Sequence, residues 1–266
     1  SLYERLTVDQ NIRFFAGLYG IGNARYAERR QFVLEMAGLK GREDALARDV
    51  RTELRVLLAY DHDDDDTLPA ARGLRPPFVV APVKNEGRGV HAAVTTAFRA
   101  TTAPFVLVWP ADDDYNTGRI DAMVARARSG CDIVCASRFM RGGRMVGAPP
   151  LKSMIIRLSA LALRVVARLP TRDPSNGLRL FSGRVVRSIP LESSAGFTYS
   201  IELLVKCHRL GWPICEMPFE WHERKTGRSR FRVLAWLPAY FVWFRYAFAT
   251  TYLRRGPSTV KLRRDT

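Results

Sequence analysis

From Leu54 onward the chain alternates short apolar runs with stretches of helical periodicity. Strand-like runs fall at residues 55–60, 78–83, 105–109 and 132–136, and helical patterns fall at residues 90–100 and 116–129. An alternation of strands and helices is typical of an α/β fold with a mostly parallel sheet and flanking helices. We therefore predict that fold class for residues 46–230.

The first 50 residues follow a different pattern. Residues 6–12 resemble a helix entry, residues 30–50 have largely helical periodicity, and no strand pattern precedes Leu54. A nucleotide-binding α/β domain normally begins with a strand. The sequence therefore predicts a helical N-terminal segment and the absence of the first strand.

Two later segments combine apolar side chains with arginines or aromatic rings. Residues 151–168 predict a helix on which Arg157, Arg164 and Arg168 share a narrow arc. This pattern fits a helix lying at a membrane surface, or one packed on the domain with a solvated arginine stripe. Residues 231–252 are rich in aromatic rings but are interrupted by Pro238 and Arg245, which favours a headgroup-level helix or an oligomer contact over a membrane span.

Charge narrows the range of partners. The chain has 266 residues, 47% of them hydrophobic, and a formal net charge of +16 that comes mostly from arginine. Arginine suits phosphate groups and anionic lipids. Nucleic acid is a less favoured partner than a nucleotide ligand, because the sequence contains no zinc-finger spacing, no aromatic RNA-binding signature and no helix-turn-helix pattern.

The four cysteines give no metal-binding pattern. Cys131, Cys135, Cys207 and Cys215 form no C-x-x-C pair, and no histidine stands in zinc-like register. Cys131 and Cys135 flank apolar residues, so we expect buried strand thiols and a reducing cytosol.

Acidic residues collect at two predicted strand ends in this basic chain. Asp112, Asp113 and Asp114 follow one apolar run, and the acidic run 61–66 follows another. Neighbouring carboxylates repel one another unless a cation offsets their charge, and oxygen ligands suit Mg²⁺ or Mn²⁺. An acidic turn that merely ends a strand is the alternative for a single cluster. Two clusters favour the carboxyl edge of a parallel sheet, where open α/β folds bind ligands.

Six short motifs occur in order along the chain. They are Tyr60-Asp61-His62 with Asp66-Thr67, Asn85-Glu86-Gly87-Arg88-Gly89, Trp109-Pro110-Ala111-Asp112-Asp113-Asp114, Ala136-Ser137-Arg138-Phe139, residues 173–181 and residues 224–230. Together they make residues 46–255 resemble family 2 glycosyltransferases of the dolichyl- or polyprenyl-phosphate mannosyltransferase type, with a GT-A (Rossmann-like) fold. Pro110 replaces the first aspartate of the family's D-x-D, so Asp112 and Asp114 become the predicted metal pair.

The resemblance implies a role for each matching residue. The implied catalytic residues are Asp112, Asp114, Asp173, Glu202, Arg224 and Arg230. The implied nucleotide-sugar-binding residues are Asp61, Asp66, Asn85, Gly87, Gly89, Arg138 and Ser229. The implied activity is inverting transfer of a sugar from a GDP- or UDP-sugar to a polyprenyl phosphate, with Mg²⁺ or Mn²⁺, at the cytoplasmic face of a membrane.

The N-terminal segment resembles another family. Ser1-Leu2-Tyr3-Glu4-Arg5-Leu6-Thr7-Val8 and Ala37-Gly38-Leu39-Lys40-Gly41-Arg42-Glu43 are similar to part of an ABC transporter ATP-binding subunit, without its Walker or signature motifs. We predict three segments: a fragment at 1–45, the glycosyltransferase domain at 46–230 and an aromatic helix with a basic tail at 231–266. The alternative function is a non-catalytic fused remnant that binds only nucleotide or membrane.

Overall fold

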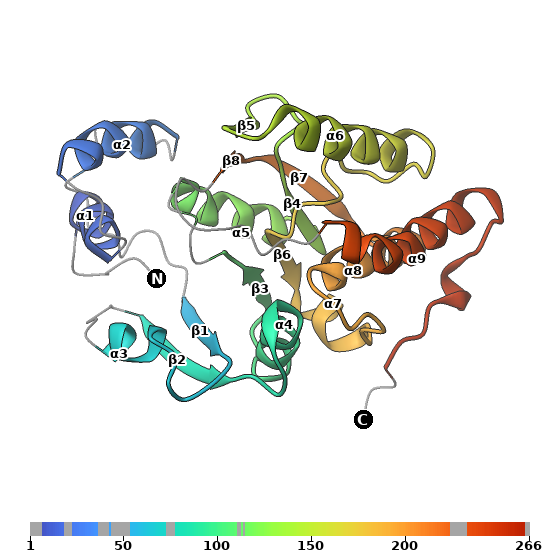
Figure 1. The fold of residues 1–266 in the computed structure, drawn as a ribbon, viewed down its shortest axis with the longest axis horizontal. Coiled ribbons are helices and arrows are strands. Elements are labelled where there is room, and N and C mark those ends of the chain that lie inside the picture. Colours follow the sequence, from blue (N-terminus) through green and yellow to red (C-terminus); the bar gives the residue numbers. More distant parts are fainter. Residues whose placement is uncertain are drawn as a thin grey trace. The chain divides into compact units, whose positions relative to one another are not determined.

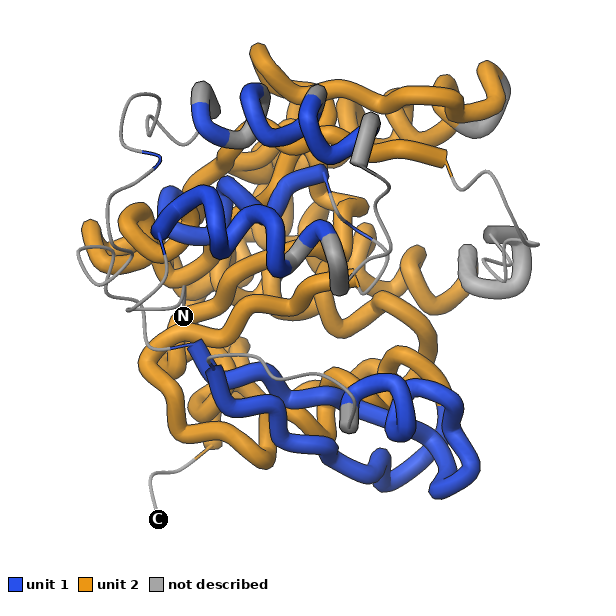
Figure 2. The backbone as a smooth tube through the Cα atoms, turned by 90° about the vertical axis from the view of Figure 1, so that its left-hand side faces the viewer, with its two compact units in different colours: residues 1–88, 112–122 blue, residues 89–111, 123–266 orange. Residues whose placement is uncertain are grey.

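The α/β class predicted from the sequence is confirmed by the computed structural model of the chain (Figure 1). The structure describes residues 7–18, 23–36, 43, 54–72, 78–110, 113, 115–223 and 233–263. Each strand contains at least one β-branched or aromatic residue, and each run is short enough to span one layer. The chain divides into two compact units, one made of residues 1–88 and 112–122 and the other of residues 89–111 and 123–266 (Figure 2).

Unit 1 contains one pair of parallel strands, β1 (Arg55–Tyr60) and β2 (Val79–Lys84), joined through the short helix α3 (Thr67–Arg72). Two helices precede them, α1 (Val8–Leu18) and α2 (Asn23–Met36). Helix α1 begins with a reciprocal cap, in which Thr7 Oγ1 accepts from the Gln10 amide at 3.2 Å and Gln10 Oε1 accepts from the Thr7 amide at 2.9 Å. The helical N-terminal segment expected from the sequence is present.

Unit 2 contains a four-stranded sheet in the order β3-β6-β4-β7. Its strands are β3 (Phe105–Val108), β4 (Ile133–Ser137), β6 (Arg179–Ser182) and β7 (Ile214–Pro218). Strand β4 runs parallel to β7, whereas β6 runs antiparallel to both β3 and β4. The sheet is therefore mixed at β6, a strand that the alternation pattern did not predict.

Short strands and helices complete unit 2. Strand β5 (Arg144–Val146) pairs in parallel with β8 (Glu220–His222). The helices are α4 (Gly89–Arg99), α5 (Ile120–Arg128, which begins in unit 1 after the 3-10 turn η2, Thr117–Arg119), α6 (Pro150–Val165), α7 (Gly183–Ser188), α8 (Thr198–Leu210), α9 (Val233–Tyr252) and the 3-10 turn η3 (Pro257–Thr259). No helix in the described ranges is long and apolar enough to cross a bilayer.

Both faces of strand β4 are buried. Ile133 and Cys135 pack in a cluster with side chains of α4, α6, α7, α8 and α9. Val134 and Ala136 pack in a second cluster with side chains of α5. Successive side chains of a strand point to opposite faces, so a strand covered on both sides has to be apolar throughout.

Strands β1 and β3 are edge strands among the described residues. Strand β1 pairs only with β2, and β3 pairs only with β6. The absence of the first strand stays a prediction, since every open sheet ends in edge strands. Unpaired strand edges leave backbone donors and acceptors that a neighbouring strand would otherwise satisfy.

The cysteines differ in part from expectation. Cys135 and Cys207 are buried thiols, as predicted for Cys135, but Cys131 forms a disulfide with Cys215. The expectation of a free thiol at Cys131 is therefore wrong. Sequence spacing did not reveal the pair because the two residues lie 84 positions apart and meet only when β4 aligns with β7.

The predicted division into segments at 45 and 230 stays a prediction. Compactness divides the chain elsewhere, because α1 and α2 belong to the same unit as β1 and β2, and α9 belongs to the same unit as the four-stranded sheet.

Candidate functional site

The ends of the parallel pair in unit 1 bring two predicted nucleotide-binding residues together. Tyr60 lies opposite Lys84 in the ladder, so the residues that follow them, Asp61 and Asn85, meet at the carboxyl edge. Asn85 Nδ2 donates to Asp61 Oδ1 at 2.7 Å, and the Asn85 amide donates to the Tyr60 carbonyl at 2.9 Å. The buried Asn85 Oδ1 has no hydrogen-bond partner among the described residues, so it remains an acceptor for a ligand donor.

The rest of the acidic run 61–66 has local partners. Asp63 pairs with Lys84, and Asp65 Oδ1 accepts from the Thr67 amide at 3.0 Å where α3 begins. The hydrogen bonds from Thr67 hold the pKa of Asp65 below its usual range. Asp66 is exposed just before α3. The run is therefore partly a helix entry, and Asp61 and Asp66 keep their ligand role as a prediction.

The glycine-rich turn after β2 includes one position that requires glycine. Gly89 adopts φ +82 at the start of α4, and a Cβ there would meet nothing within 4 Å. Glycine is therefore favoured by backbone conformation, since side-chain-bearing residues are strained in the left-handed region. A phosphate role for Gly87 and Gly89 stays a prediction.

The middle aspartate of Asp112-Asp113-Asp114 is committed to its own turn. Asp113 Oδ1 accepts from the amides of Tyr115 and Asn116 at 2.9 and 3.2 Å, and Asn116 Nδ2 contacts both carboxylate oxygens. Asp112 and Asp114 lie outside the described residues, and the described part of the chain contains no cluster of three or more His, Cys, Asp or Glu side chains placed to hold a metal. The metal role of Asp112 and Asp114 therefore stays a prediction.

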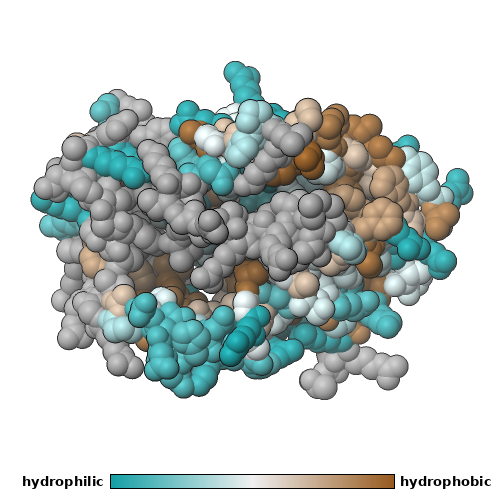
Figure 3. Space-filling model, viewed as in Figure 1, coloured by the Kyte–Doolittle hydropathy of each residue, from teal (hydrophilic) through white to brown (hydrophobic). Residues whose placement is uncertain are grey.

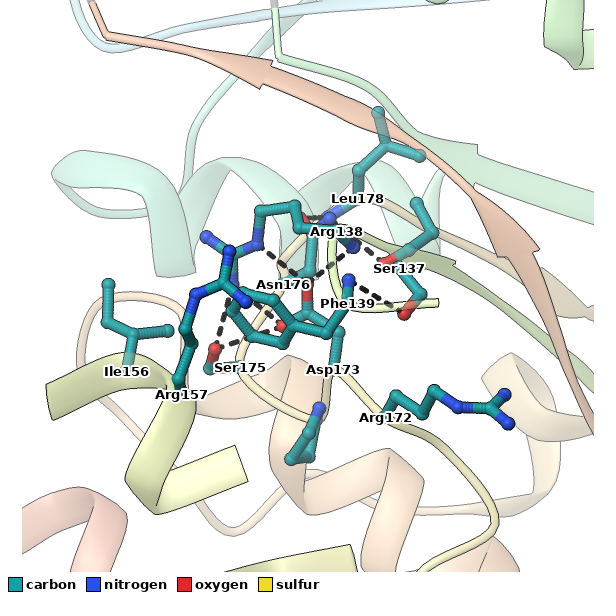
Figure 4. Close-up of polar contacts among 12 residues, drawn as sticks. Ser137, Arg138, Phe139, Ile156, Arg157, Arg172, Asp173, Ser175, Asn176 and Leu178 are labelled. Carbon is teal, nitrogen blue, oxygen red and sulfur yellow. Dashed lines mark hydrogen bonds and ion pairs between the residues drawn. The ribbon is translucent and has the colours of Figure 1, made fainter. Parts of the chain in front are cut away.

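In unit 2 the structure joins Arg138 to Asp173 (Figure 4). Asp173 Oδ2 accepts from Arg138 Nε at 2.6 Å and from the Arg138 amide at 3.0 Å, and Asp173 Oδ1 accepts from Arg138 Nη2 at 2.7 Å. Ser175 Oγ accepts from Arg138 Nη2 at 2.9 Å and donates to Asp173 Oδ1 at 3.2 Å. The pair is bidentate and both side chains are buried, which gives a strong, geometrically fixed contact.

The carboxylate of Asp173 is held in its ionised form. Burial alone would raise its pKa, but the charge and hydrogen bonds of Arg138, with a further contribution from Arg179, outweigh burial and leave the pKa below its usual range. Arg179 is itself fully buried and donates to the carbonyls of Pro174 and Ser200. A carboxylate with a lowered pKa is a weak proton acceptor.

Glu202, the other predicted acceptor-side acid, is also buried and occupied. Its Oε1 accepts from the Glu192 amide at 2.7 Å and from Lys206 Nζ at 2.6 Å, and its Oε2 accepts from the Ser193 amide at 2.8 Å. Lys206 is buried beside it and also bonds the Pro190 carbonyl. Glu202 thus anchors the segment before α8.

Three predicted residues, Arg224, Ser229 and Arg230, lie outside the described residues. Their proposed contacts with the leaving diphosphate therefore stay predictions.

Three residues important to the unit 2 cluster were not predicted as site residues. Ser175 completes the Arg138–Asp173 pair, and Asn176 pins the following loop by donating to the Ala136 carbonyl at 3.0 Å. Gly143 lies so close to the end of β4 that a Cβ would stand 2.3 Å from the Ser137 carbonyl oxygen. The motif around residues 173–181 contained the first two, but only contacts across 37 and 40 positions reveal their roles.

Two known proteins with similar sequences have names that specify a lipid phosphate. The undecaprenyl-phosphate mannosyltransferase of Micrococcus luteus is 28% identical over 190 residues, which cover 69% of this chain and 78% of that protein. The dolichol-phosphate mannosyltransferase of Pyrococcus furiosus is 24% identical over 182 residues, covering 66% of this chain and 50% of that protein.

Solved structures also match. The glucosyl-3-phosphoglycerate synthase of Mycobacterium tuberculosis, solved in complex with Mn²⁺, UDP and glucosyl-3-phosphoglycerate, aligns with a TM-score of 0.47 and 18% identity over 76% of this chain and 68% of that one. The family model described as glycosyl transferase family 2 matches residues 43–188, more than half of the sequence. The chain therefore belongs to glycosyl transferase family 2.

Proposed function

We propose that the chain transfers a sugar from a nucleotide diphosphate donor to a polyprenyl phosphate, with inversion at the anomeric carbon. Membership of glycosyl transferase family 2 supports the reaction class. The names of the Micrococcus luteus and Pyrococcus furiosus relatives support an acceptor of the lipid-phosphate class.

The observation that carries the acceptor assignment is the state of Asp173 and Glu202, the two implied catalytic residues that are candidates for a general base. Asp173 and Glu202 are both fully buried, and the oxygens of each already accept hydrogen bonds from cations and backbone amides. A hydroxyl acceptor needs a base to remove its proton. A phosphate acceptor arrives ionised and needs none, so it fits carboxylates that are occupied.

The residues that follow β1 and β2 would hold the nucleotide of the donor. Asn85 Oδ1 offers an acceptor to a base or ribose donor group, and Asp61 fixes the Asn85 side chain by its hydrogen bond. Asp66 and the Gly87-to-Gly89 turn are the proposed neighbours of the nucleotide. A Mg²⁺ or Mn²⁺ ion bound by Asp112 and Asp114 would supply charge stabilisation to the leaving diphosphate, and Arg224, Ser229 and Arg230 would contact the same group.

Matched acceptors test the proposal. The purified chain is given GDP-mannose or UDP-glucose with Mn²⁺ or Mg²⁺, and either a short polyprenyl phosphate or the corresponding polyprenol. We expect glycosylated product only with the phosphate. Equal product from the polyprenol, or product only from a hydroxyl acceptor, would overturn the acceptor assignment.

The unpaired edges of β1 and β3 favour a second candidate, a non-catalytic remnant. Titration calorimetry with GDP- and UDP-sugars, with and without Mn²⁺, separates the two. Metal-dependent donor affinity supports the enzyme, and metal-independent binding or none supports the remnant.

A further inference from the structure

Helix α6 is apolar on two opposite sides. Ala160, Leu163 and Ala167, at and just after the helix, are buried against unit 2. Four others share the opposite side at helical spacing and are each 52–63% exposed: Met154, Leu158, Leu161 and Val165. A helix with apolar residues all round is normally covered on all sides, so the exposed stripe requires a partner.

The apolar stripe continues onto the end of α9. Thr251 Oγ1 donates to the Ala167 carbonyl at 2.8 Å, which ties the two helix ends together within unit 2. The adjacent Tyr252 and Leu253 are 59% and 68% exposed. Figure 3 shows hydrophobic atoms gathered along the upper right edge, where Figure 1 places α6 and the far end of α9. We call this surface, comprising the four stripe residues with Tyr252 and Leu253, the apolar face.

Arginines border the apolar face. Arg157 and Arg164 lie along one flank of the stripe at helical spacing. The helix expected over residues 151–168 ends at Val165, so Arg168 follows it rather than sharing its face. The sequence contains no acidic residue from Arg144 to Arg172 or from Arg224 to Arg264. Arg157 also stacks on Phe139 at 5.0 Å, next to the Arg138–Asp173 pair (Figure 4).

Both helix ends carry an arginine in an unfavourable backbone conformation. Arg168 follows α6 with φ 54, and Arg254 follows α9 with φ 49, and both side chains are exposed. Glycine is the usual residue at such helix ends, because a Cβ is strained there. An arginine at each of these positions therefore costs conformational free energy, and a glycine would end the helix without that cost.

We propose that the apolar face and its arginines dock the chain on an anionic lipid surface. The stripe would insert at the level of the acyl boundary while the arginines contact lipid phosphates. A second copy of the chain is the less favourable occupant, because it would place two arginine borders of like charge together on a protein of net charge +16. Arg157 of α6 stacks on Phe139, next to Arg138 (Figure 4). A lipid acceptor in the bilayer would therefore be delivered close to Arg138, an inference that rests on the proposed function.

Vesicle co-sedimentation of the full chain tests the docking without any donor present. We expect binding to vesicles containing phosphatidylglycerol and little binding to pure phosphatidylcholine. The double variant Leu158→Gln, Leu161→Gln should reduce the partition coefficient at least tenfold, because each exposed leucine would lose its apolar burial. The double variant Arg168→Gly, Arg254→Gly should reduce the partition coefficient about fivefold for each arginine removed.

Two features of the design separate docking from structural damage. Arg168→Gly, Arg254→Gly should keep or raise the melting temperature, since glycine relieves the backbone strain, so lower binding with higher stability is the expected signature. The matched control, Arg126→Gln, Arg128→Gln, removes the same charge from exposed positions of α5 and should retain most of the binding.

Three outcomes would overturn the proposal. They are equal losses in the α5 control and the helix-end variant, no vesicle binding at all, or sedimentation equilibrium showing a dimer that Leu158→Gln, Leu161→Gln dissociates. A chain that binds vesicles but transfers no sugar would leave the docking intact and count against the proposed function alone.

Discussion

At the scale of residues, the buried pair of Arg138 and Asp173 dominates unit 2. Both side chains are nearly or fully excluded from solvent, and three hydrogen bonds join them. Such a pair contributes little net stability relative to apolar substitutes, yet removing one partner strands the other charge.

We expect Arg138→Met to lower the free energy of unfolding by about 3–5 kcal/mol, because Asp173 would be left buried without its cation. The double variant Arg138→Met, Asp173→Leu should recover much of that loss. Urea denaturation of the two variants and of Arg126→Met, an exposed control, measures the coupling. Additive losses in the double variant would contradict the pair.

The three consecutive aspartates should separate by role. Asp112→Asn and Asp114→Asn should each abolish Mn²⁺-dependent donor binding with little change in melting temperature, because the ion needs both carboxylates. Asp113→Ala should instead lower stability by about 1 kcal/mol or more, because it removes the turn around Asn116. Calorimetric titration and thermal unfolding of all three variants make the comparison, and retained metal-stimulated binding in the double Asp112, Asp114 variant would contradict the metal pair.

His91 makes stability depend on pH. Burial lowers the pKa of His91 against the opposing charge of Glu202, so the folded state binds a proton less readily than the unfolded chain does. The contribution of neutral His91 to stability is therefore fully present above the unfolded-state pKa of about 6.5. This contribution decreases as the pH falls through that value toward the lower pKa of the folded state. We expect His91→Gln to lose less unfolding free energy than wild type between pH 7.5 and 5.5, with His62→Gln, at an exposed position, as the control.

At the scale of elements, strands with regular apolar runs were predictable and irregular ones were not. The run predicted at residues 55–60 is β1, and those at residues 105–109 and 132–136 match β3 and β4 within a residue at each end. Strand β6 was not predicted because it begins with Arg179, a buried cation that breaks the apolar pattern.

The candidate site follows the same division. Motif matching named Asp61 and Asn85 as nucleotide-binding residues, and the structure brings them together because neighbouring parallel strands finish at one edge. The pairing of Arg138 with Asp173 depends on where β4 and the loop before β6 come together, which local periodicity does not encode. Motif matching named both residues but gave them separate roles.

Helices α1 and α2 supply no strand to the unpaired edge of β1. Replacing residues 1–45 with a strand-and-helix segment ending in a V-Y-N-E-like motif should raise stability by several kcal/mol, as a strand would satisfy unpaired backbone groups worth about 1–3 kcal/mol each when buried. Donor affinity should rise with it. Hydrogen exchange of the unmodified chain provides the outcome that would contradict this prediction. If the amides of α1 and α2 are protected as strongly as those of β3, the N-terminal segment is fully integrated into the fold.

At the scale of the whole molecule, the predicted roles fall in different units. Asp61 and Asn85 belong to unit 1, whereas Arg138, Asp173 and Glu202 belong to unit 2. The chain passes between the units after residues 88, 111 and 122. Each unit can therefore be probed separately, by donor binding for the first and by unfolding for the second.

The disulfide between Cys131 and Cys215 holds the two pieces of the chain together after a protease cuts between these residues. The bond spans 84 positions, and the enclosed segment contains Arg138, α6, Asp173 and Glu202. A protease that cleaves once anywhere inside this segment, for example in the loop between α6 and β6, severs the backbone without releasing a fragment. We expect such nicked protein to migrate as one species on a non-reducing gel and as two after reduction, and separation without reductant would show that the two sulfurs are not bonded in the purified chain.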